Sequence, residues 1–416
     1  MNKIKFCTNC LYSNLHPLGL TFNEAGVCSG CQVHKEKNYL NWEERKNKLL
    51  KKIKSYKTKK SNNYDCIIPV NGAYDSYYTV HLAKNILGLH PLLVSNNNYY
   101  NSPLGIKNLA NLRIKFDCDI LFKNPNPISV KKITKFTLQD LGNVYWHSIA
   151  GQTAFPVQTA INYKIPLIIW GAHQGVEQVG MFSHTHEVEM TRRHRKDHDL
   201  MGIEAEDLIN VANTSLLNES DIFQYIYPSD DHINSIGVIG IYLSNYFRWD
   251  PKKQHELMIK KFDYQTCKFN RTFDCYDFVD SYVYMEIHDL LKFYKHGYSK
   301  VTDHVCREIR HKRISRSKGI DLVKKYEHEE IKYVDSFCKW LGINEKSLKY
   351  VLNRNRNPKF WKEYEPNNWK YKGLSSLIKK NNYLRNKVKN ISYICNSKID
   401  LGKKSEFITV GKGYNN

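Results

Sequence analysis

Apolar and polar positions alternate along the first half of the chain in a way that predicts strands separated by helices. Four short runs rich in apolar residues predict strands at 66–70, 90–98, 117–124 and 165–172. The stretches between them have the periodicity of amphipathic helices. Strands that alternate with helices indicate an α/β fold with a doubly wound parallel sheet, whose ligands bind at the carboxyl ends of the strands.

The tight turn after the first predicted strand leads directly into a helix and has the sequence Asn71-Gly72-Ala73-Tyr74-Asp75-Ser76. A strand, small-residue turn and helix start direct backbone N–H groups and the positive end of a helix dipole at one spot, which suits a phosphate. Asp75 could hold a metal ion that bridges phosphate oxygens. An ordinary loop in which Asp75 and Ser76 cap the helix explains the local pattern equally well.

Two other loops are expected beside this turn, because the carboxyl ends of parallel strands meet at one edge of a sheet. They are residues 95–98, after the second strand, and residues 170–175, after the fourth. Trp170 and His173 are therefore candidate site residues. Packing in the core for Trp170 and a surface loop for His173 are the alternatives.

The net charge of +22 over 416 residues raises the question of a nucleic-acid partner. Residues 43–60 and 378–416 each carry nine Lys and Arg against two acidic residues, so most of the excess lies in two flanking segments. Charge runs of this kind are usually solvated faces or tails, and a nucleic-acid partner is not expected. The chain has neither a long apolar run nor an apolar signal region at its start, which predicts a cytoplasmic protein without a membrane span.

Four of the eleven cysteines have the spacing of a zinc ribbon. They are Cys7, Cys10, Cys28 and Cys31, two C-x2-C pairs separated by 17 residues. Four thiolates complete a tetrahedron around zinc and leave no position for a substrate, so the Zn2+ ion would be structural. Two disulfides or free thiols are the alternative.

Two segments are rich in residues that bind anions. Glu189, Arg192 and Arg195 are spaced as on one helix face, and Arg307, Arg310, Arg313 and Arg316 recur every third residue, as in a basic stripe along a helix. Either set could hold an anionic substrate, or form ion pairs within the protein. The nearby His184 and His186 lack a third ligand with convincing spacing and are expected to be solvated.

These patterns divide the chain into five parts. We expect a zinc ribbon at 1–40, a linking amphipathic helix at 41–60, a nucleotide-binding domain at 61–215, a mostly helical domain for substrate or partner at 216–372 and a basic tail at 373–416.

The stretch VNGAYDS resembles the SGGxDS signature of the PP-loop ATP pyrophosphatases. A wider resemblance extends from about Cys7 to Lys372. The cysteine ribbon with FNEAGVCSGC, the PP-loop turn and the blocks YKIPLIIWG, EVEMTRRHRKDH, NYFRWD and LLKFYKHGYSK occur in the order found in the N-acetyl-sugar amidotransferases of bacterial surface-glycan biosynthesis.

The resemblance implies that ATP, with Mg2+, adenylates the acetamido oxygen of an N-acetylated sugar, and that ammonia from a partner glutaminase then displaces AMP to give an acetamidino group. The family serves nonulosonic acids such as pseudaminic or legionaminic acid on flagellin, and some O-antigen sugars of lipopolysaccharide. Gly72 to Ser76 would bind pyrophosphate, with Asp75 and Ser76 as the catalytic residues and Asp75 holding Mg2+. Asn71 and the Trp170-Gly171 pair would border the nucleotide.

The chain departs from the family pattern at three positions. Asn71 replaces a serine, Ala73 replaces a glycine, and Ala172 stands where the family has a glutamate after Trp-Gly. A tRNA-modifying PP-loop enzyme, or an impaired relative that binds ligand or partner without catalysis, therefore stays open beside the amidotransferase.

Overall fold

The computed structural model of the chain describes residues 4–57, 63–211, 216–373 and 391–397. Of the predicted basic tail at 373–416, only residues 373 and 391–397 are among the described residues. The last three positions of the predicted linking helix, 58–60, also lie outside them. None of the helices in the described part is long and apolar enough to cross a lipid bilayer.

Within the described ranges, five parallel strands form one sheet in the order β3-β2-β1-β4-β5. The strands are β1 (Cys66–Pro69), β2 (Pro91–Asn96), β3 (Ile120–Lys123), β4 (Leu167–Trp170) and β5 (Ile239–Tyr242), and a separate antiparallel hairpin consists of β6 (Trp361–Glu365) and β7 (Asn368–Tyr371). The chain leaves β1 toward β2 on one side and returns to β4 on the other. This reversal of strand order is the switch point at which open α/β sheets bind their ligands.

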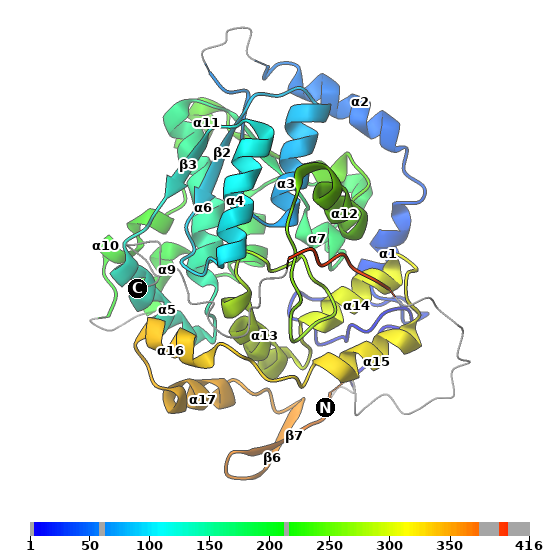
Figure 1. Cartoon of the computed structure of the whole chain (residues 1–416), viewed down its shortest axis with the longest axis vertical. Helices are drawn as coiled ribbons and strands as arrows, with labels where there is room; N and C mark the ends of the chain where they lie inside the picture. The colour runs from blue at the N-terminus through cyan, green and yellow to red at the C-terminus, as the bar shows by residue number, and fades with distance from the viewer. Residues whose placement is uncertain (1–3, 58–62, 212–215, 374–390, 398–416) are drawn as a thin grey trace.

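Helices cover both faces of the sheet and form most of the chain after β5 (Figure 1). The α-helices are α1 (Ser29–Glu36), α2 (Trp42–Ile53), α3 (Tyr74–Val80), α4 (Pro103–Phe116), α5 (Pro127–Leu141), α6 (Trp146–Tyr163), α7 (Gln174–Glu177), α8 (Arg192–His194), α9 (Ala205–Val211), α10 (Glu219–Ile222), α11 (Asp230–Ile236), α12 (Pro251–Phe262), α13 (Tyr282–His296), α14 (Lys300–Arg310), α15 (Arg316–Tyr326), α16 (Val334–Leu341) and α17 (Glu345–Arg354). The 3-10 and π segments are η1 (His81–Ile86), η2 (His184–His186), η3 (Arg195–Asp199), η4 (Phe223–Tyr225) and η5 (Leu243–Asn245).

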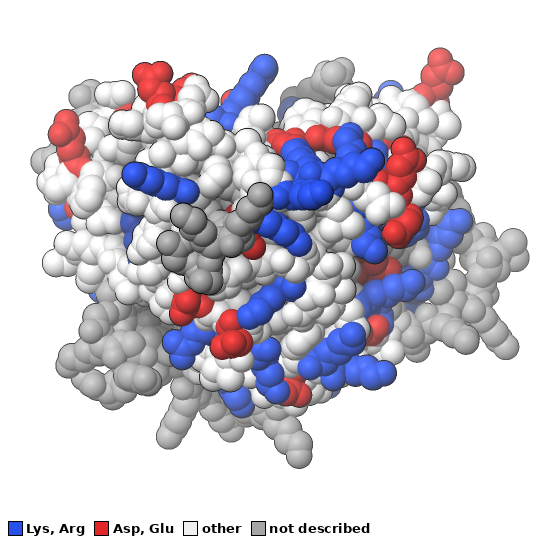
Figure 2. Space-filling model, turned by 90° about the horizontal axis from the view of Figure 1, so that it is seen from above, with Lys and Arg blue, Asp and Glu red and all other residues white. Residues whose placement is uncertain are grey.

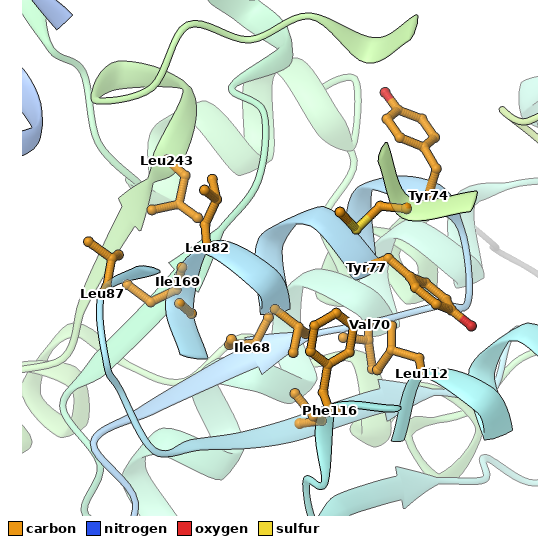
Figure 3. Close-up of a cluster of buried hydrophobic side chains, with 14 of the residues drawn as sticks. Ile68, Val70, Tyr74, Tyr77, Leu82, Leu87, Leu112, Phe116, Ile169 and Leu243 are labelled. Atoms are coloured by element: carbon orange, nitrogen blue, oxygen red, sulfur yellow. The ribbon is translucent and has the colours of Figure 1, made fainter. Parts of the chain in front are cut away.

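Side chains on one face of the sheet pack against α3, α4 and α12. Ile68 of β1 and Ile169 of β4 are fully buried there with Tyr77 and Phe116 (Figure 3). Full burial of such side chains contributes roughly 1.5–3 kcal/mol each. This packing fixes α3, and therefore the turn at its start, above the carboxyl end of β1.

The alternate side chains of the same strands point to the opposite face. Ile67 of β1 and Ile168 of β4 pack there against Ala154 and Val157 of α6. Because neighbouring strand residues are buried on opposite faces, the sheet has helices on both sides. The predicted doubly wound α/β fold is confirmed.

The fifth strand was not predicted from the sequence. β5 lies beyond residue 215, in the part predicted to be mostly helical. It is a four-residue segment bounded by Gly237, which ends α11 in the left-handed conformation, and by η5. A run this short shows no periodicity of its own, and its pairing with β4 is what makes it a strand.

The N-terminal cysteine segment forms two short turns joined by isolated bridges, Phe6 to Ser13 and Phe22 to Cys28. It packs on α14 and α15 through a shared cluster that includes Leu11 and Val305. α2 follows, capped by the side chain of Asn41, and buries Leu49 and Ile53 at the edge of the main core. The predicted amphipathic helix is thus present and ends at Ile53.

Basic side chains are widely spread over the face shown in Figure 2, with acidic side chains among them. On α2, Lys46 lies 3.7 Å from Glu43 and Lys52 lies 3.4 Å from Glu189. Part of the positive charge of this segment is therefore balanced by local ion pairs.

Candidate active site and zinc centre

A cavity of about 490 Å³, called the central cavity below, lies at the carboxyl ends of β1 and β4. The turn after β1 contributes Asn71, Ala73 and Asp75, and the loop after β4 contributes Ala172 and Gln174. The opposite wall comes from the helical region, mainly α13 and α14. The cavity therefore lies between the sheet and the helical region.

A second cavity of about 280 Å³ opens on the other side of the turn and is called the apolar cavity below. Ser95 and Asn97 from the end of β2 line it together with Ile106 and Leu109 of α4. Asn71 lines both cavities. The loops after β1, β2 and β4 thus converge, as the sequence predicted.

Gly72 makes the turn after β1 possible. Its φ of +81° is in the left-handed region, and an added Cβ would lie 2.7 Å from the Gly105 carbonyl oxygen. Ala73, in contrast, has φ −84° and ψ 169°, which any residue adopts. The methyl group of Ala73 therefore fits the turn, although the resembling family has glycine at this position.

Asn71 holds the turn together from within. Its Oδ1 accepts hydrogen bonds from the Ser76 hydroxyl at 2.9 Å and from the Ala73 N–H at 3.1 Å. Its own N–H donates to Ser76 Oγ at 3.1 Å. An amide oxygen thus orders the loop, and the first turn of α3 leaves the N–H groups of Tyr74 and Asp75 without partners inside the helix. These groups can donate to an anion.

Three carboxylates influence one another at this end of the central cavity. Burial and the charge of Asp277 raise the pKa of Asp75 to about 6. Burial and the charge of Asp75 raise the pKa of Asp280 to about 7. A divalent cation would relieve this repulsion, and oxygen ligands are those that Mg2+ prefers. Asp75 and Asp280 are therefore the carboxylates at this end of the cavity that could hold Mg2+.

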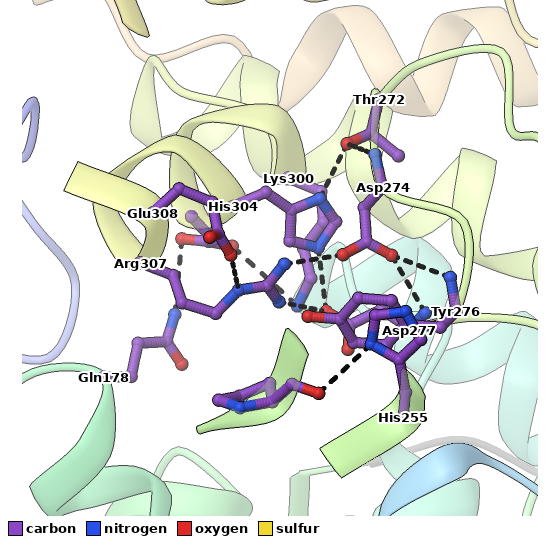
Figure 4. A network of polar contacts seen from close by, with 12 residues as sticks. Gln178, His255, Thr272, Asp274, Tyr276, Asp277, Lys300, His304, Arg307 and Glu308 are labelled. Carbon is purple, nitrogen blue, oxygen red and sulfur yellow. Dashed lines mark hydrogen bonds and ion pairs between the residues drawn. The ribbon is translucent and has the colours of Figure 1, made fainter. Parts of the chain in front are cut away.

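The opposite wall holds a charged network built around Arg307 of α14 (Figure 4). Its guanidinium group lies 2.6 Å from Asp274, 3.4 Å from Asp277 and 2.8 Å from Glu308. His304 Nε2 is 2.8 Å from Asp277 Oδ2. Burial alone would raise the pKa of Asp277, but His304 and Arg307 hold it well below its usual range. The network keeps Arg307 and Asp277 charged at the cavity wall.

Sequence reasoning missed this wall. Asp277, Asp280, Lys300, His304 and Arg307 all line the central cavity, yet only Arg307 had been singled out. The signal was available as three aspartates at intervals of three in DCYDFVD, ahead of the Arg-rich helix. Their convergence with Asp75 depends on how the helical region packs on the sheet.

The predicted arginine stripe is wrong as a single helix face. α14 ends at Arg310, and Lys312 has a positive φ of 57°, so Arg313 lies in a loop and Arg316 begins the next helix. Arg313 bonds to Glu308 at 2.9 Å and to Asp250. Arg313 therefore forms ion pairs within the protein, which was the alternative to binding an anionic substrate.

Arg310 joins the ribbon to the central cavity. It lines the cavity and donates to the Gln178 carbonyl oxygen at 2.6 Å and to Cys31 Sγ at 3.5 Å. Gly30 permits this approach, because a Cβ there would lie 2.3 Å from Arg310 Nη2. A guanidinium group against cysteine sulfur stabilises the thiolates that a metal requires.

The predicted helix face of Glu189, Arg192 and Arg195 is also wrong. Thr191 caps α8, which begins at Arg192, so Glu189 lies outside the helix. The Glu189 carboxylate accepts from the Tyr242 N–H at 2.8 Å at the end of β5. Arg195 pairs with the buried Glu204, and Arg192 lies 3.9 Å from the same carboxylate. These contacts fasten the segment to its neighbours.

The residues after β4 are more buried than predicted. Gly171 lets Thr79 approach, since a Cβ at Gly171 would lie 2.8 Å from Thr79 Oγ1. Trp170 lines a smaller cavity of about 120 Å³. His173 is fully buried, and burial together with nearby histidines lowers its pKa to about 3, so its imidazole is neutral. His184, expected to be solvated, is buried beside Trp42, whereas His186 is exposed.

The four ribbon cysteines come together as the spacing predicted. Their sulfur atoms all lie within 4.8 Å of one another, and Cys10 Sγ is 3.6 Å from Cys28 Sγ. Tetrahedral zinc with Zn–S bonds of about 2.3 Å needs sulfurs about 3.8 Å apart. Backbone N–H groups of Cys10 and Cys28 donate to Cys7 Sγ at 3.4 and 3.3 Å. None of the eleven cysteines forms a disulfide, so the four sulfur atoms of this cluster are available to hold zinc.

Residues 254–375 match the family model described as "LPS biosynthesis protein WbpG-like, C-terminal domain". A comparison with proteins of curated function gives no match. Among solved structures, an NH3-dependent NAD synthetase from Campylobacter jejuni is 11% identical over 54% of this chain and 94% of its own, with a TM-score of 0.28. An NMN synthetase from Francisella tularensis is 12% identical over 48% and 93%, with a TM-score of 0.25.

The structural likenesses are too weak to support a conclusion about this chain. The family match, in contrast, covers α12 to α17 and the hairpin, and includes all the charged residues of the cavity wall around Arg307. It confirms the relationship to proteins of surface-glycan biosynthesis that the sequence predicted. Residues 254–375 are thus similar to the C-terminal domain of the WbpG-like LPS biosynthesis proteins.

Proposed function

We propose that the protein is an ATP-dependent amidotransferase that converts the N-acetyl group of a bacterial surface-glycan sugar to an acetamidino group. One observation carries the proposal. The phosphate-binding turn after β1 and the charged wall of the WbpG-like domain face each other across the same central cavity. The reaction would take place in the cytoplasm, where ATP is available.

The two cavities suit the two parts of the reaction. The apolar cavity, lined by Ile106 and Leu109, would take the adenosine of ATP, and Asn71 stands where it meets the central cavity. The N–H groups of Tyr74 and Asp75 would bind the departing pyrophosphate. The sugar would then occupy the central cavity, with its acetamido oxygen directed at the α-phosphate.

Asp75 and Asp280 would hold Mg2+, which when bound supplies positive charge to the phosphate oxygens. Lys300 on the opposite wall would bind an anionic group of the sugar, such as a carboxylate or phosphate. Arg307, which pairs with Asp274 and Glu308, would keep that wall ordered. The catalytic contribution of the chain is thus positioning and charge stabilisation. Ammonia would come from a partner glutaminase.

The test measures AMP and pyrophosphate release from the purified protein with ATP, Mg2+, an ammonium salt and a panel of N-acetyl sugars. We expect sugar-dependent release that Asp75→Asn lowers by about 10²-fold or more, because the variant loses a charge at the site. Asp197→Asn is the matched control, since Asp197 lies on the surface beside Arg193.

Three outcomes would contradict the proposal. Release that depends on tRNA instead of sugar would favour a tRNA-modifying enzyme. Sugar or nucleotide binding without release would indicate a binding protein. Equal release by Asp75→Asn and the wild type would remove the turn after β1 from the reaction.

A further inference from the structure

A second group of metal-ligating side chains lies apart from the ribbon cysteines. His194 ends α8, and His198 and Asp199 belong to η3. One ligand atom of each lies within 4.8 Å of the others. Asp199 Oδ1 is 2.7 Å from His198 Nδ1 and 4.0 Å from His194 Nε2, and the two imidazoles stack with ring centroids 4.6 Å apart. The carboxylate oxygen therefore lies near both rings. These three residues are called the His/Asp cluster below.

Buried ring nitrogens at the cluster have no hydrogen-bond partner among the described residues. They are His194 Nδ1, His198 Nε2 and both nitrogens of His173. The side chains of His194 and His198 are 5% and 9% exposed, and His173 packs against His194 with ring centroids 4.4 Å apart. A buried polar group that is left without a hydrogen-bond partner destabilises the folded protein. Each of the three imidazoles thus has at least one buried ring nitrogen without a partner, which a metal ion or its bound water would supply, while His198 Nδ1 is hydrogen-bonded to Asp199 Oδ1 at 2.7 Å.

The backbone at this cluster departs from a regular α-helix. η3 is a π segment, in which the Leu200 N–H bonds to the Arg195 carbonyl oxygen five residues earlier at 3.0 Å. A single π turn lacks the regular hydrogen bonds of an α-helix, and such turns occur frequently at functional sites. Here the wide turn stacks His194 on His198, four residues apart.

The positive charges nearest in sequence are bound to other groups. Arg195 pairs with Glu204 and lies over the Tyr227 ring, with 4.5 Å from Cζ to the centroid. Lys196 lies 3.9 Å from Asp207. These cations are paired with other carboxylates, so they do not neutralise Asp199.

We propose that His194, His198 and Asp199 bind a divalent transition-metal ion such as Zn2+. Two imidazole nitrogens with one carboxylate oxygen favour zinc and related ions over Mg2+. Three protein ligands leave a coordination position open, unlike the four thiolates of the ribbon. His198 and Asp199 line the central cavity, so water or a substrate atom can reach the ion from that side. The site is independent of the proposed amidotransferase reaction.

The test uses the full-length protein, stripped with a chelator and titrated with Co2+. The ribbon gives a thiolate-to-Co2+ charge-transfer band, whereas nitrogen and oxygen ligands give only weak visible bands. We expect a second equivalent of Co2+ that adds visible absorption without thiolate charge transfer. His198→Ala and Asp199→Asn should lose this equivalent and keep the thiolate band, which also reports that the chain is folded.

His186→Ala is the matched control, because His186 is an exposed histidine of a nearby segment and should keep both equivalents. Two results would overturn the proposal. Wild-type protein that binds Co2+ only with the thiolate band has no second site, whatever the variants do. A second equivalent that persists in both His198→Ala and Asp199→Asn lies elsewhere.

Discussion

Replacing Gly72 by alanine should damage the turn after β1 more than its position in a loop suggests. The residue has φ +81°, and the left-handed conformation costs an ordinary L-residue about 1–2 kcal/mol. The new Cβ would also lie 2.7 Å from the Gly105 carbonyl oxygen and 3.1 Å from Leu109 Cβ. The first of these atoms belongs to the backbone of α4, which cannot move without disturbing the core.

The chain offers a control that separates the two costs. Gly202 has φ +86° and nothing within 4 Å of an added Cβ, so Gly202→Ala carries the conformational cost alone. We expect Gly202→Ala to lower the free energy of unfolding by about 1 kcal/mol. Gly72→Ala should lower it by about 2–4 kcal/mol, because core overpacking of about 1–3 kcal/mol adds to the same conformational cost.

Urea unfolding of both variants measures this difference, and binding of a non-hydrolysable ATP analogue measures its functional consequence. Gly72→Ala should weaken nucleotide binding because α4 moves away from the turn and opens the apolar cavity. Gly202→Ala should bind as the wild type does. Equal destabilisation by the two variants would refute the reasoning, since the contact with Gly105 would then carry no cost.

Three further predictions concern the charged residues and the ribbon. Asp280 has a pKa of about 7 in the folded protein against 3.8 normally, so its own contribution to stability falls as the pH rises from 4 to 7. Asp280→Asn should therefore be more stable than the wild type by about 2–4 kcal/mol at pH 8 and equally stable at pH 4 in urea unfolding. A stability difference that does not change with pH would contradict this. Arg313→Ala leaves the buried Glu308 with one partner fewer and should lower the free energy of unfolding by about 1–3 kcal/mol. Arg193→Ala, at an exposed ion pair, should lower it by about 0–1 kcal/mol. Equal effects would exclude a structural role for the Arg313 ion pair. Cys28→Ser should contain no zinc by elemental analysis and should have a lower melting temperature, because the ribbon packs on α14 and α15. Cys118→Ser is the control and should keep its zinc. Zinc retained in Cys28→Ser would contradict the four-cysteine site.

The effect of Asn71 and Ala73, which depart from the PP-loop signature, can be judged only from the folded turn. Asn71 uses its amide oxygen to bind the Ser76 hydroxyl and the Ala73 N–H, and Ala73 has an ordinary backbone conformation. Neither substitution distorts the turn. Ala172 lines the central cavity without supplying a carboxylate. Asp277 and Asp280, which lie in the part that matches the WbpG-like domain, line the same cavity.

The sequence by itself determined the features whose signal is local. Alternating strands and helices gave the parallel sheet, C-x2-C spacing gave the cysteine cluster, and the small-residue turn gave the start of α3 at the end of β1. In each case the interacting groups lie within a few residues, or repeat with a fixed period, so their geometry follows from backbone stereochemistry.

Only the tertiary structure decided which distant residues share the cavity. Arg307 and Arg313 look equivalent in the sequence, yet the end of α14 directs one to the cavity wall and the other to Asp250. β5 is a strand because β4 pairs with it. The pKa of Asp75 rises because the packing buries the carboxyl group and brings Asp277, about 200 residues away, near it. Such contacts depend on the packing of the helical region against the sheet, which buries charges together that no spacing along the chain connects.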